Sequence, residues 1–275
     1  MNVSVDIPVL FVKTILLRPY VFFFLAMSLF SASRLLGWKR TAVMFGITWV
    51  TAFVCEFSST RMGVPFGEYY YTGSTVGEEL YLFNIPFMDS LSFTFLLYAS
   101  YCLALLFVLP YRPSSQPRAR QLLSREALSW PVIGLTSLLF MYIDIVIDPV
   151  ALQGGRWFLG QIYGYPDPGV YFGVPLANFA GWFIVGLLAM LGYRVVDRRA
   201  GSLPELPPAV RVRDVLLGCG LYYLVLLFNL VVTFWIGEAL LGMAGCLLYV
   251  PLTALVLLKL AGKLPVSART EASRC

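Results

Sequence analysis

The sequence contains no histidine and few charged residues. Of its 275 residues only 13% are Asp, Glu, Lys or Arg, whereas 59% are hydrophobic. Because so few charges cannot solvate a globule of this size, the composition predicts an integral membrane protein. The lack of histidine removes the commonest acid–base side chain and the usual ligand of zinc, haem and di-iron centres. Any chemistry must therefore use carboxyl groups, tyrosine, arginine, lysine or the backbone.

Several familiar motifs are also missing. The five cysteines are scattered, mostly inside apolar runs, and none has the C-x-x-C spacing of a metal or redox site. The sequence has no phosphate-binding loop, no Asp-rich diphosphate motif and no G-x-S-x-G nucleophile. These absences weigh against prenyl transfer, redox chemistry and ester hydrolysis, and we expect neither a metal nor a cofactor. The net charge of +5 comes from short basic loops without a recognisable binding module, so a nucleic-acid partner is not expected.

Apolar runs of the length needed to cross a bilayer, about 20 residues, recur along the whole chain. They lie near residues 17–37, 41–57, 89–110, 129–149, 175–194, 214–236 and 238–261. The first run resembles the apolar core of a signal peptide, but it continues through Leu36, which favours a retained helix. We predict an all-α polytopic membrane bundle of about seven helices that forms a single domain over 1–275.

The basic residues predict the orientation of this bundle. Arginine and lysine cluster in every second connection and after the last run, while the connections 58–88 and 150–174 are acidic or nearly uncharged. The positive-inside rule then places the amino terminus outside and the carboxyl terminus in the cytoplasm. The predicted location is the cell (inner, cytoplasmic) membrane.

The carboxyl groups are the most informative residues, because ionisable groups at membrane depth are rare and usually functional. The second run ends at Glu56, the third begins at Asp89, the fourth ends near Asp148 and the fifth begins near Asn178. All four therefore fall in one layer at the extracytoplasmic end. Asp144 lies four residues before Asp148, on the same helix face and one turn deeper.

The helix ends predict different roles for these groups. Glu56 and Asp148 lie at carboxyl ends, where the helix dipole and the apolar medium both disfavour the charged form, so they are candidate proton donors. Asp89 and Asn178 lie in first turns after prolines, where an acceptor is favoured, so Asp89 is the better base or water-holding group. Asp89 and Asn178 could instead be helix caps, and Asp144 could bond a neighbouring helix.

In a second alternative the two candidate proton donors have only a structural role, as ion pairs between Glu56 and Arg61 and between Asp148 and Arg156. Under the functional interpretation Arg61 contacts the substrate. Glu238, in a tight turn, is expected to be only an interfacial residue.

Two long connections, 61–73 and 154–175, are rich in Gly, Tyr, Phe and Pro. We interpret them as re-entrant or interfacial hairpins packed over the bundle, since irregular backbone near membrane depth persists only where protein or a cavity surrounds it. The alternative, an aromatic belt at the headgroups, does not account for the glycines. Aromatic faces can stabilise a carbocation, so these rings are candidate substrate contacts. The candidates are Tyr69, Tyr70, Tyr71, Trp157, Tyr163, Tyr165, Tyr171 and Trp182.

Three segments carry a resemblance to a known family. They are EFSSTRMGVPFGEYYY at 56–71, the Asp-Pro at 148–149 and YFGVPLANFAGW at 171–182. Together they resemble the carotenoid-biosynthesis membrane family typified by CruF, over residues 40–195. The resemblance implies a hydratase that adds water to the terminal double bond of an acyclic carotenoid, such as lycopene, γ-carotene or a bacterioruberin precursor. It also implies a lipophilic carotenoid substrate, a bilayer location and other carotenoid-pathway membrane enzymes as candidate partners.

This chemistry is compatible with the residues present. Protonation of the less substituted alkene carbon gives a tertiary cation that water captures, which needs no nucleotide, metal or flavin. The acid would be Glu56 or Asp148, and Asp144, Asp89 or Asn178 would hold the water. A membrane lycopene cyclase or isomerase, which starts with the same protonation, is one alternative. A transporter is another, although its polar site would be expected midway through the membrane.

Overall fold

The computed structural model describes residues 6–109, 126–199, 203, 206–207 and 212–263. The helices are α1 (Ile7–Leu17), α2 (Pro19–Leu35), α3 (Trp38–Met62), α4 (Phe87–Val108), α6 (Trp130–Ala151), α7 (Leu176–Arg198), α8 (Val212–Trp235) and α9 (Ala239–Leu260). Short elements in the connections are β1 (Tyr70–Tyr71), β2 (Tyr81–Leu82), β3 (Ile85–Pro86), the 3-10 turn η1 (Gly154–Arg156) and β4 (Tyr163–Gly164). The predicted all-α membrane bundle is confirmed.

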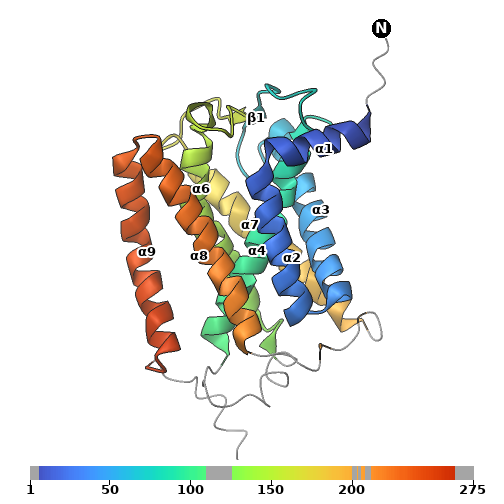
Figure 1. The fold of residues 1–275 in the computed structure, drawn as a ribbon, viewed down its shortest axis with the longest axis vertical. Coiled ribbons are helices and arrows are strands. Elements are labelled where there is room, and N and C mark those ends of the chain that lie inside the picture. Colours follow the sequence, from blue (N-terminus) through green and yellow to red (C-terminus); the bar gives the residue numbers. More distant parts are fainter. Residues whose placement is uncertain (1–5, 110–125, 200–202, 204–205, 208–211, 264–275) are drawn as a thin grey trace, which may run out of the picture.

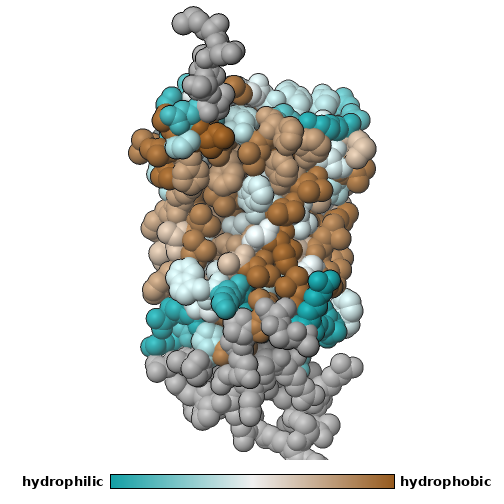
Figure 2. Space-filling model, turned by 90° about the vertical axis from the view of Figure 1, so that its right-hand side faces the viewer, coloured by the Kyte–Doolittle hydropathy of each residue, from teal (hydrophilic) through white to brown (hydrophobic). Residues whose placement is uncertain are grey.

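Six helices, α3, α4 and α6 to α9, are each long and apolar enough to cross a membrane. The predicted first run is α2, and α1 and α2 together form a seventh candidate span with a 91° bend between them. In Figure 1, α2 runs along the bundle while α1 lies across its end. Figure 2 shows hydrophobic side chains over the middle of the molecule and more hydrophilic ones near its ends. The exposed apolar side chains therefore face lipid.

Helix α4 is the centre of the bundle. It contacts α2, α3, α6 and α8, and nearly all of its side chains from Phe93 to Leu106 are buried. Its sequence is apolar or small on every face, as expected of a helix surrounded by others. The one charged residue of α4, Asp89, lies in its first turn beside Ser90. That end of the bundle is therefore where polar chemistry is possible.

The helix ends confirm three of the four predicted positions. Asp89 lies in the first turn of α4, Asp148 in the last turn of α6 and Asn178 in the first turn of α7. Glu56 differs, because α3 continues through Met62 and Glu56 lies more than one turn inside the helix. The helix stops at Gly63, whose φ of 70° is a left-handed conformation that suits glycine. The prediction that the dipole at a helix carboxyl end disfavours the charged form of Glu56 was therefore wrong.

The two hairpins form one joint cap. Strand β1 of the first pairs antiparallel with β4 of the second, with Tyr70 opposite Gly164 and Tyr71 opposite Tyr163. Strands β2 and β3 pair with each other beyond the first hairpin, later in the connection between α3 and α4. The cap lies at the same end of the bundle as α1 in Figure 1.

A buried ion pair attaches the cap to the amino-terminal helices. Arg18, at the bend between α1 and α2, donates to both carboxylate oxygens of Glu79, at 3.1 and 2.8 Å, and to the carbonyl of Leu159. Both charged side chains are fully buried. The backbone N–H of Leu80 adds a hydrogen bond to Thr14 Oγ1, at 2.7 Å. Arg18 therefore contacts both the α3–α4 connection, through Glu79, and the second hairpin, through Leu159, a role that sequence patterning did not suggest.

We predict that Glu79→Gln strongly destabilises the protein, because it leaves Arg18 buried without a counter-charge. Removing one partner of a buried pair typically costs about 3–5 kcal/mol. The matched control is Glu238→Gln, whose pair with Arg156 has side-chain exposures of 30% and 48%. Exposed pairs contribute about 0–1 kcal/mol. Melting temperatures of the purified variants in one detergent measure the difference; equal melting temperatures would contradict the structural role of Arg18.

Candidate active site

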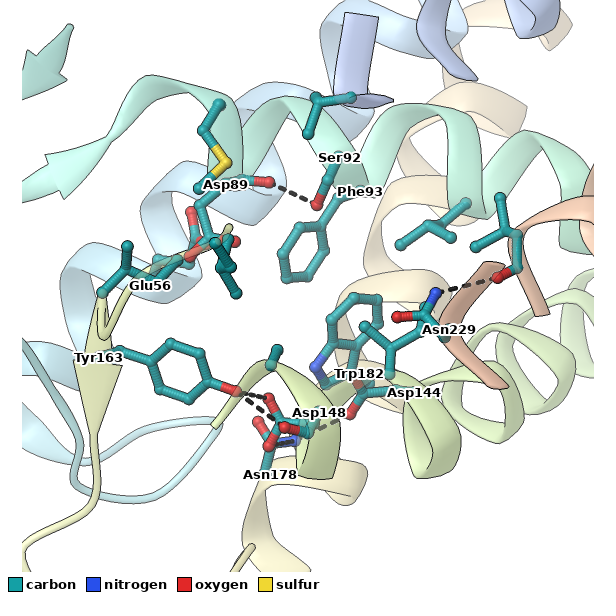
Figure 3. A pocket seen from close by; sticks show the side chains of 18 of the residues that line it. Glu56, Asp89, Ser92, Phe93, Asp144, Asp148, Tyr163, Asn178, Trp182 and Asn229 are labelled. Atoms are coloured by element: carbon teal, nitrogen blue, oxygen red, sulfur yellow. Dashed lines mark hydrogen bonds between the residues drawn. The ribbon is translucent and has the colours of Figure 1, made fainter. Parts of the chain in front are cut away.

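A cavity opens among α2, α3, α4, α6, α7, α8 and the cap. Aromatic and aliphatic side chains make up most of its wall, and the polar groups gather at the cap end. Every predicted site residue lines this cavity except Arg61, Tyr70 and Tyr171. Figure 3 shows Glu56 and Asp89 on one side and Asp144, Asp148 and Asn178 on the other.

The β1–β4 pair places four tyrosines on one wall. Side chains alternate along a strand, and directly opposed residues of an antiparallel pair share a face. Because Tyr71 is opposite Tyr163, their neighbours two positions away, Tyr69 and Tyr165, fall on the same face. All four side chains line the cavity. The ring of Tyr69 lies 5.4 Å from that of Tyr71 and 6.4 Å from those of Tyr163 and Tyr165, so it bridges the two hairpins.

The same alternation turns Tyr70 away from the cavity. Tyr70 is 51% exposed and lies on the outer face of the strand pair, opposite Gly164. A Cβ atom at Gly164 would come within 2.9 Å of the Tyr70 hydroxyl, so glycine leaves room for this ring. The structure therefore corrects the expectation that Tyr70 contacts a ligand in this cavity.

Arg61 and Tyr171 also lie outside the cavity. The Arg61 guanidinium packs 3.4 Å from the ring centroid of Phe57 and donates to the Phe57 carbonyl at 3.0 Å. Tyr171 packs edge-on against Phe179, with ring centroids 5.8 Å apart. The Arg61 side chain therefore folds back along its own helix, α3, onto Phe57, which lies one turn earlier. Neither residue therefore lines this cavity.

The alternative of structural ion pairs is wrong for both candidate donors. The carboxylate of Glu56 is bonded to hydroxyl groups, and that of Asp148 to hydroxyl groups and an amide. Arg156 instead pairs with Glu238, at the turn between α8 and α9. Glu238 is thus an ion-pair partner that fixes the second hairpin to this turn.

The first cluster centres on the Tyr71 hydroxyl. It lies 3.0 Å from Glu56 Oε1 and 2.6 Å from Asp89 Oδ2, while Tyr69 donates to it at 3.5 Å. Ser90 donates to the other oxygen of Glu56. A phenol has one proton, so Tyr71 can donate to only one carboxyl group at a time. Both contacts are hydrogen bonds only when one of the two carboxyl groups carries a proton.

The second cluster centres on Asp148. Its Oδ1 accepts from Tyr163 at 2.5 Å, and its Oδ2 accepts from Tyr165 at 2.8 Å and from the Asn178 amide at 3.2 Å. The same amide donates to Asp144 Oδ2 at 2.8 Å. This confirms that Asp144 and Asp148 share a helix face. Asn178 bonds side chains of α6 with its amide, so it is more than a helix cap.

The tyrosines of the cap remain hydrogen-bond donors. Burial, and then the nearby Asp148 carboxylate, raise the pKa of the Tyr163 phenol well above its ordinary value. Burial, followed by Asp89 and Glu56, does the same to the pKa of Tyr71. Both phenols therefore stay protonated at physiological pH and hold their carboxyl partners in fixed positions.

Stacked rings form the deeper wall. Trp182 stacks on Phe93 with centroids 4.2 Å apart and planes 14° apart, and Phe140 lies 4.7 Å from Trp182. Trp182 lies one turn after Asn178, so one face of α7 carries both an amide and an aromatic surface. Such rings attract positive charge through their quadrupoles. The arrangement can thus deliver a proton to an apolar ligand and stabilise the cation that forms.

Sequence reasoning missed several lining residues. Among them are Tyr20, Phe66, Phe93, Phe228 and Asn229. Phe66 lies within the quoted P-F-G motif and could have been included. Asn229, on α8, is an isolated polar residue in a long apolar run, and the intramembrane-polar rule would have identified it.

Comparison with known proteins gives a family and one curated relative. The family described as carotenoid biosynthesis protein matches residues 16–252, beyond the expected 40–195 at both ends. The chain is also similar to a bisanhydrobacterioruberin hydratase of Haloarcula japonica, with 34% identity over 147 residues. That match covers 53% of this chain and 42% of the relative, so it spans less than half of that protein. No solved structure gives a significant match.

We predict that Gly181→Ala destabilises the fold around the cavity. A Cβ atom there would lie 2.4 Å from Phe66 Cδ1 and 2.8 Å from Phe66 Cα, so the cap would have to shift. Overpacking of this kind costs about 1–3 kcal/mol. The control is Gly134→Ala on α6, where nothing lies within 4 Å of the added atom; it should be neutral or gain up to about 1 kcal/mol. Melting temperatures of the two variants and of the wild type are measured in one detergent. A Gly181→Ala variant that melts at the wild-type temperature would refute the close contact.

Proposed function

The chain belongs to the carotenoid biosynthesis protein family, and we propose that it is a membrane hydratase that adds water to the terminal double bond of an acyclic carotenoid. The name of the Haloarcula relative supports hydration as the reaction. The observation that carries the proposal is the cavity, where two clusters of buried carboxyl groups face each other beside stacked aromatic rings. A soluble polar substrate would need hydrogen-bonding groups over more of the cavity wall than this one polar layer.

The reaction needs an acid, a cation-tolerant wall and a held water. A carboxyl group protonates the less substituted carbon of the terminal alkene, which places positive charge on the tertiary carbon. Trp182 and Phe93 supply the aromatic surface that stabilises this charge. A water bound by the carboxyl groups opposite attacks the tertiary carbon and loses a proton to them, giving a tertiary alcohol. The chain's residues thus perform each proton transfer.

The position of the polar layer fits a long apolar rod. The polar groups lie at the cap end, whereas the described wall on the side of α8 is apolar apart from Asn229. The end group of a carotenoid can reach the carboxyl groups while the polyene stays among apolar side chains or lipid. We place the cap on the outer face of the cell membrane, following the basic connections at the opposite end.

Pigment analysis tests the proposed function. The purified full chain is incubated in detergent with lycopene or with bisanhydrobacterioruberin, and products are analysed by mass spectrometry. We expect a product heavier by one water for each reacted end from at least one probe. Glu56→Gln conserves volume but removes an acid–base group, so hydration should fall by about 10²–10⁴-fold. An isomeric product would indicate a cyclase, and unchanged pigment with both probes would refute the hydratase.

The tyrosine wall gives a second prediction with a matched control on the same strand. Tyr69 faces the cavity and Tyr70 faces outward. If the Tyr69 ring stabilises a cation, Tyr69→Phe should keep most hydration activity. Tyr69→Leu should lose about 0.5–2 kcal/mol of cation stabilisation, which lowers the rate by about twofold to thirtyfold. Tyr70→Leu should remain active. Product formed per folded protein measures all three, and full activity of Tyr69→Leu would exclude this role.

A further inference from the structure

The carboxyl groups of the second cluster differ in how completely they are hydrogen-bonded. Asp148 receives donors on both oxygens, from Tyr163, Tyr165 and Asn178. These three donors stabilise the negative charge of Asp148, and protonation would weaken their hydrogen bonds, because a neutral carboxyl group has less acceptor capacity than a carboxylate. The surroundings of Asp148 therefore hold it as an anion, although sequence reasoning had named it as a candidate acid.

Asp144 has the opposite surroundings. Its Oδ2 accepts from Asn178, but its Oδ1 is buried without a hydrogen-bond partner among the described residues. The side chain is fully buried and lines the cavity beside Trp182. A bare anionic oxygen in apolar surroundings next to a second carboxylate is strongly unfavourable. A proton on Oδ1 removes that charge and leaves an O–H donor with no acceptor among the described residues.

The first cluster can take up a proton. The Tyr71 hydroxyl contacts both Glu56 and Asp89 but can donate its proton to only one of them. When one of the two carboxyl groups is protonated, the pair still carries one negative charge and can accept a second proton. Ser90 donates to Glu56 and stabilises that charge. These two groups lie across the cavity from Asp144 in Figure 3. They are placed to receive a proton from a water held between the clusters.

We infer that Asp144 is the proton donor of the hydration reaction and that the Glu56–Asp89 pair is the base for the attacking water. This inference rests on the proposed function. The Asp144 O–H bond breaks as the C–H bond forms, and the water O–C bond forms at the tertiary carbon. The water then loses one proton to the Glu56–Asp89 pair. Overall one water is added, and after product release a proton returns from that pair to Asp144 through solvent.

Deuterium labelling separates the two roles. The purified full chain reacts in D₂O with bisanhydrobacterioruberin or lycopene, and both product and recovered substrate are analysed by mass spectrometry. Wild type should give a tertiary alcohol that carries deuterium on the formerly less substituted alkene carbon, which is adjacent to the carbon that bears the new hydroxyl group. Glu56→Gln should lose hydration by about 10²–10⁴-fold yet still exchange deuterium into recovered substrate, because the cation forms and then loses a proton. Asp144→Asn should lose both hydration and exchange.

Three results would overturn this assignment. Hydration by Asp144→Asn within about threefold of wild type, or exchange without hydration in that variant, would show that another group is the donor. Loss of exchange in Glu56→Gln would refute the assignment even if Asp144→Asn failed to fold, since the base should not be needed for protonation. Wild-type protein that neither hydrates nor exchanges either probe would refute the proposed function itself.

Discussion

The constraint on which this structure depends is the enclosure of four carboxyl groups at one end of an apolar bundle, three of them buried and Asp89 partly buried. Buried polar groups must find hydrogen-bond partners, and lipid offers none. Here the donors are phenols, hydroxyls and one amide rather than arginines. Neutral donors leave the carboxyl groups able to gain and lose protons, whereas a buried arginine would fix them as anions. The donor set therefore keeps the site chemically active.

The cap exists because those donors must be held in place. Strand pairing between two connections far apart in sequence puts Tyr71 and Tyr163 side by side, each against a different carboxyl cluster. The Arg18–Glu79 pair then ties the cap to the bend between α1 and α2. This pair is spent on structure, since it does not line the cavity. The ion pair that holds the cap and the carboxyl groups that line the cavity are thus separate sets of residues.

The structure also explains why the cavity suits an apolar rod. Its polar groups occupy one layer, and stacked Phe93 and Trp182 lie beside them. A substrate that needs one reacting end, and otherwise only apolar contact, makes use of this asymmetry. The two carboxyl clusters differ in hydrogen bonding, and in the mechanism that we propose this difference makes Asp144 the proton donor and the Glu56–Asp89 pair the proton acceptor.

The sequence by itself determined the membrane bundle and the layer of polar residues that lines the cavity, because hydropathy and helix direction fix the depth of each side chain. It could not separate Tyr70 from Tyr69 and Tyr71, since that depends on which strand pairs with β1 and hence on which face is covered. It also could not foresee the partner of Arg18, or that Asp144 and not Asp148 is left with a bare oxygen. Those outcomes depend on contacts between segments distant in sequence, which only tertiary packing brings together.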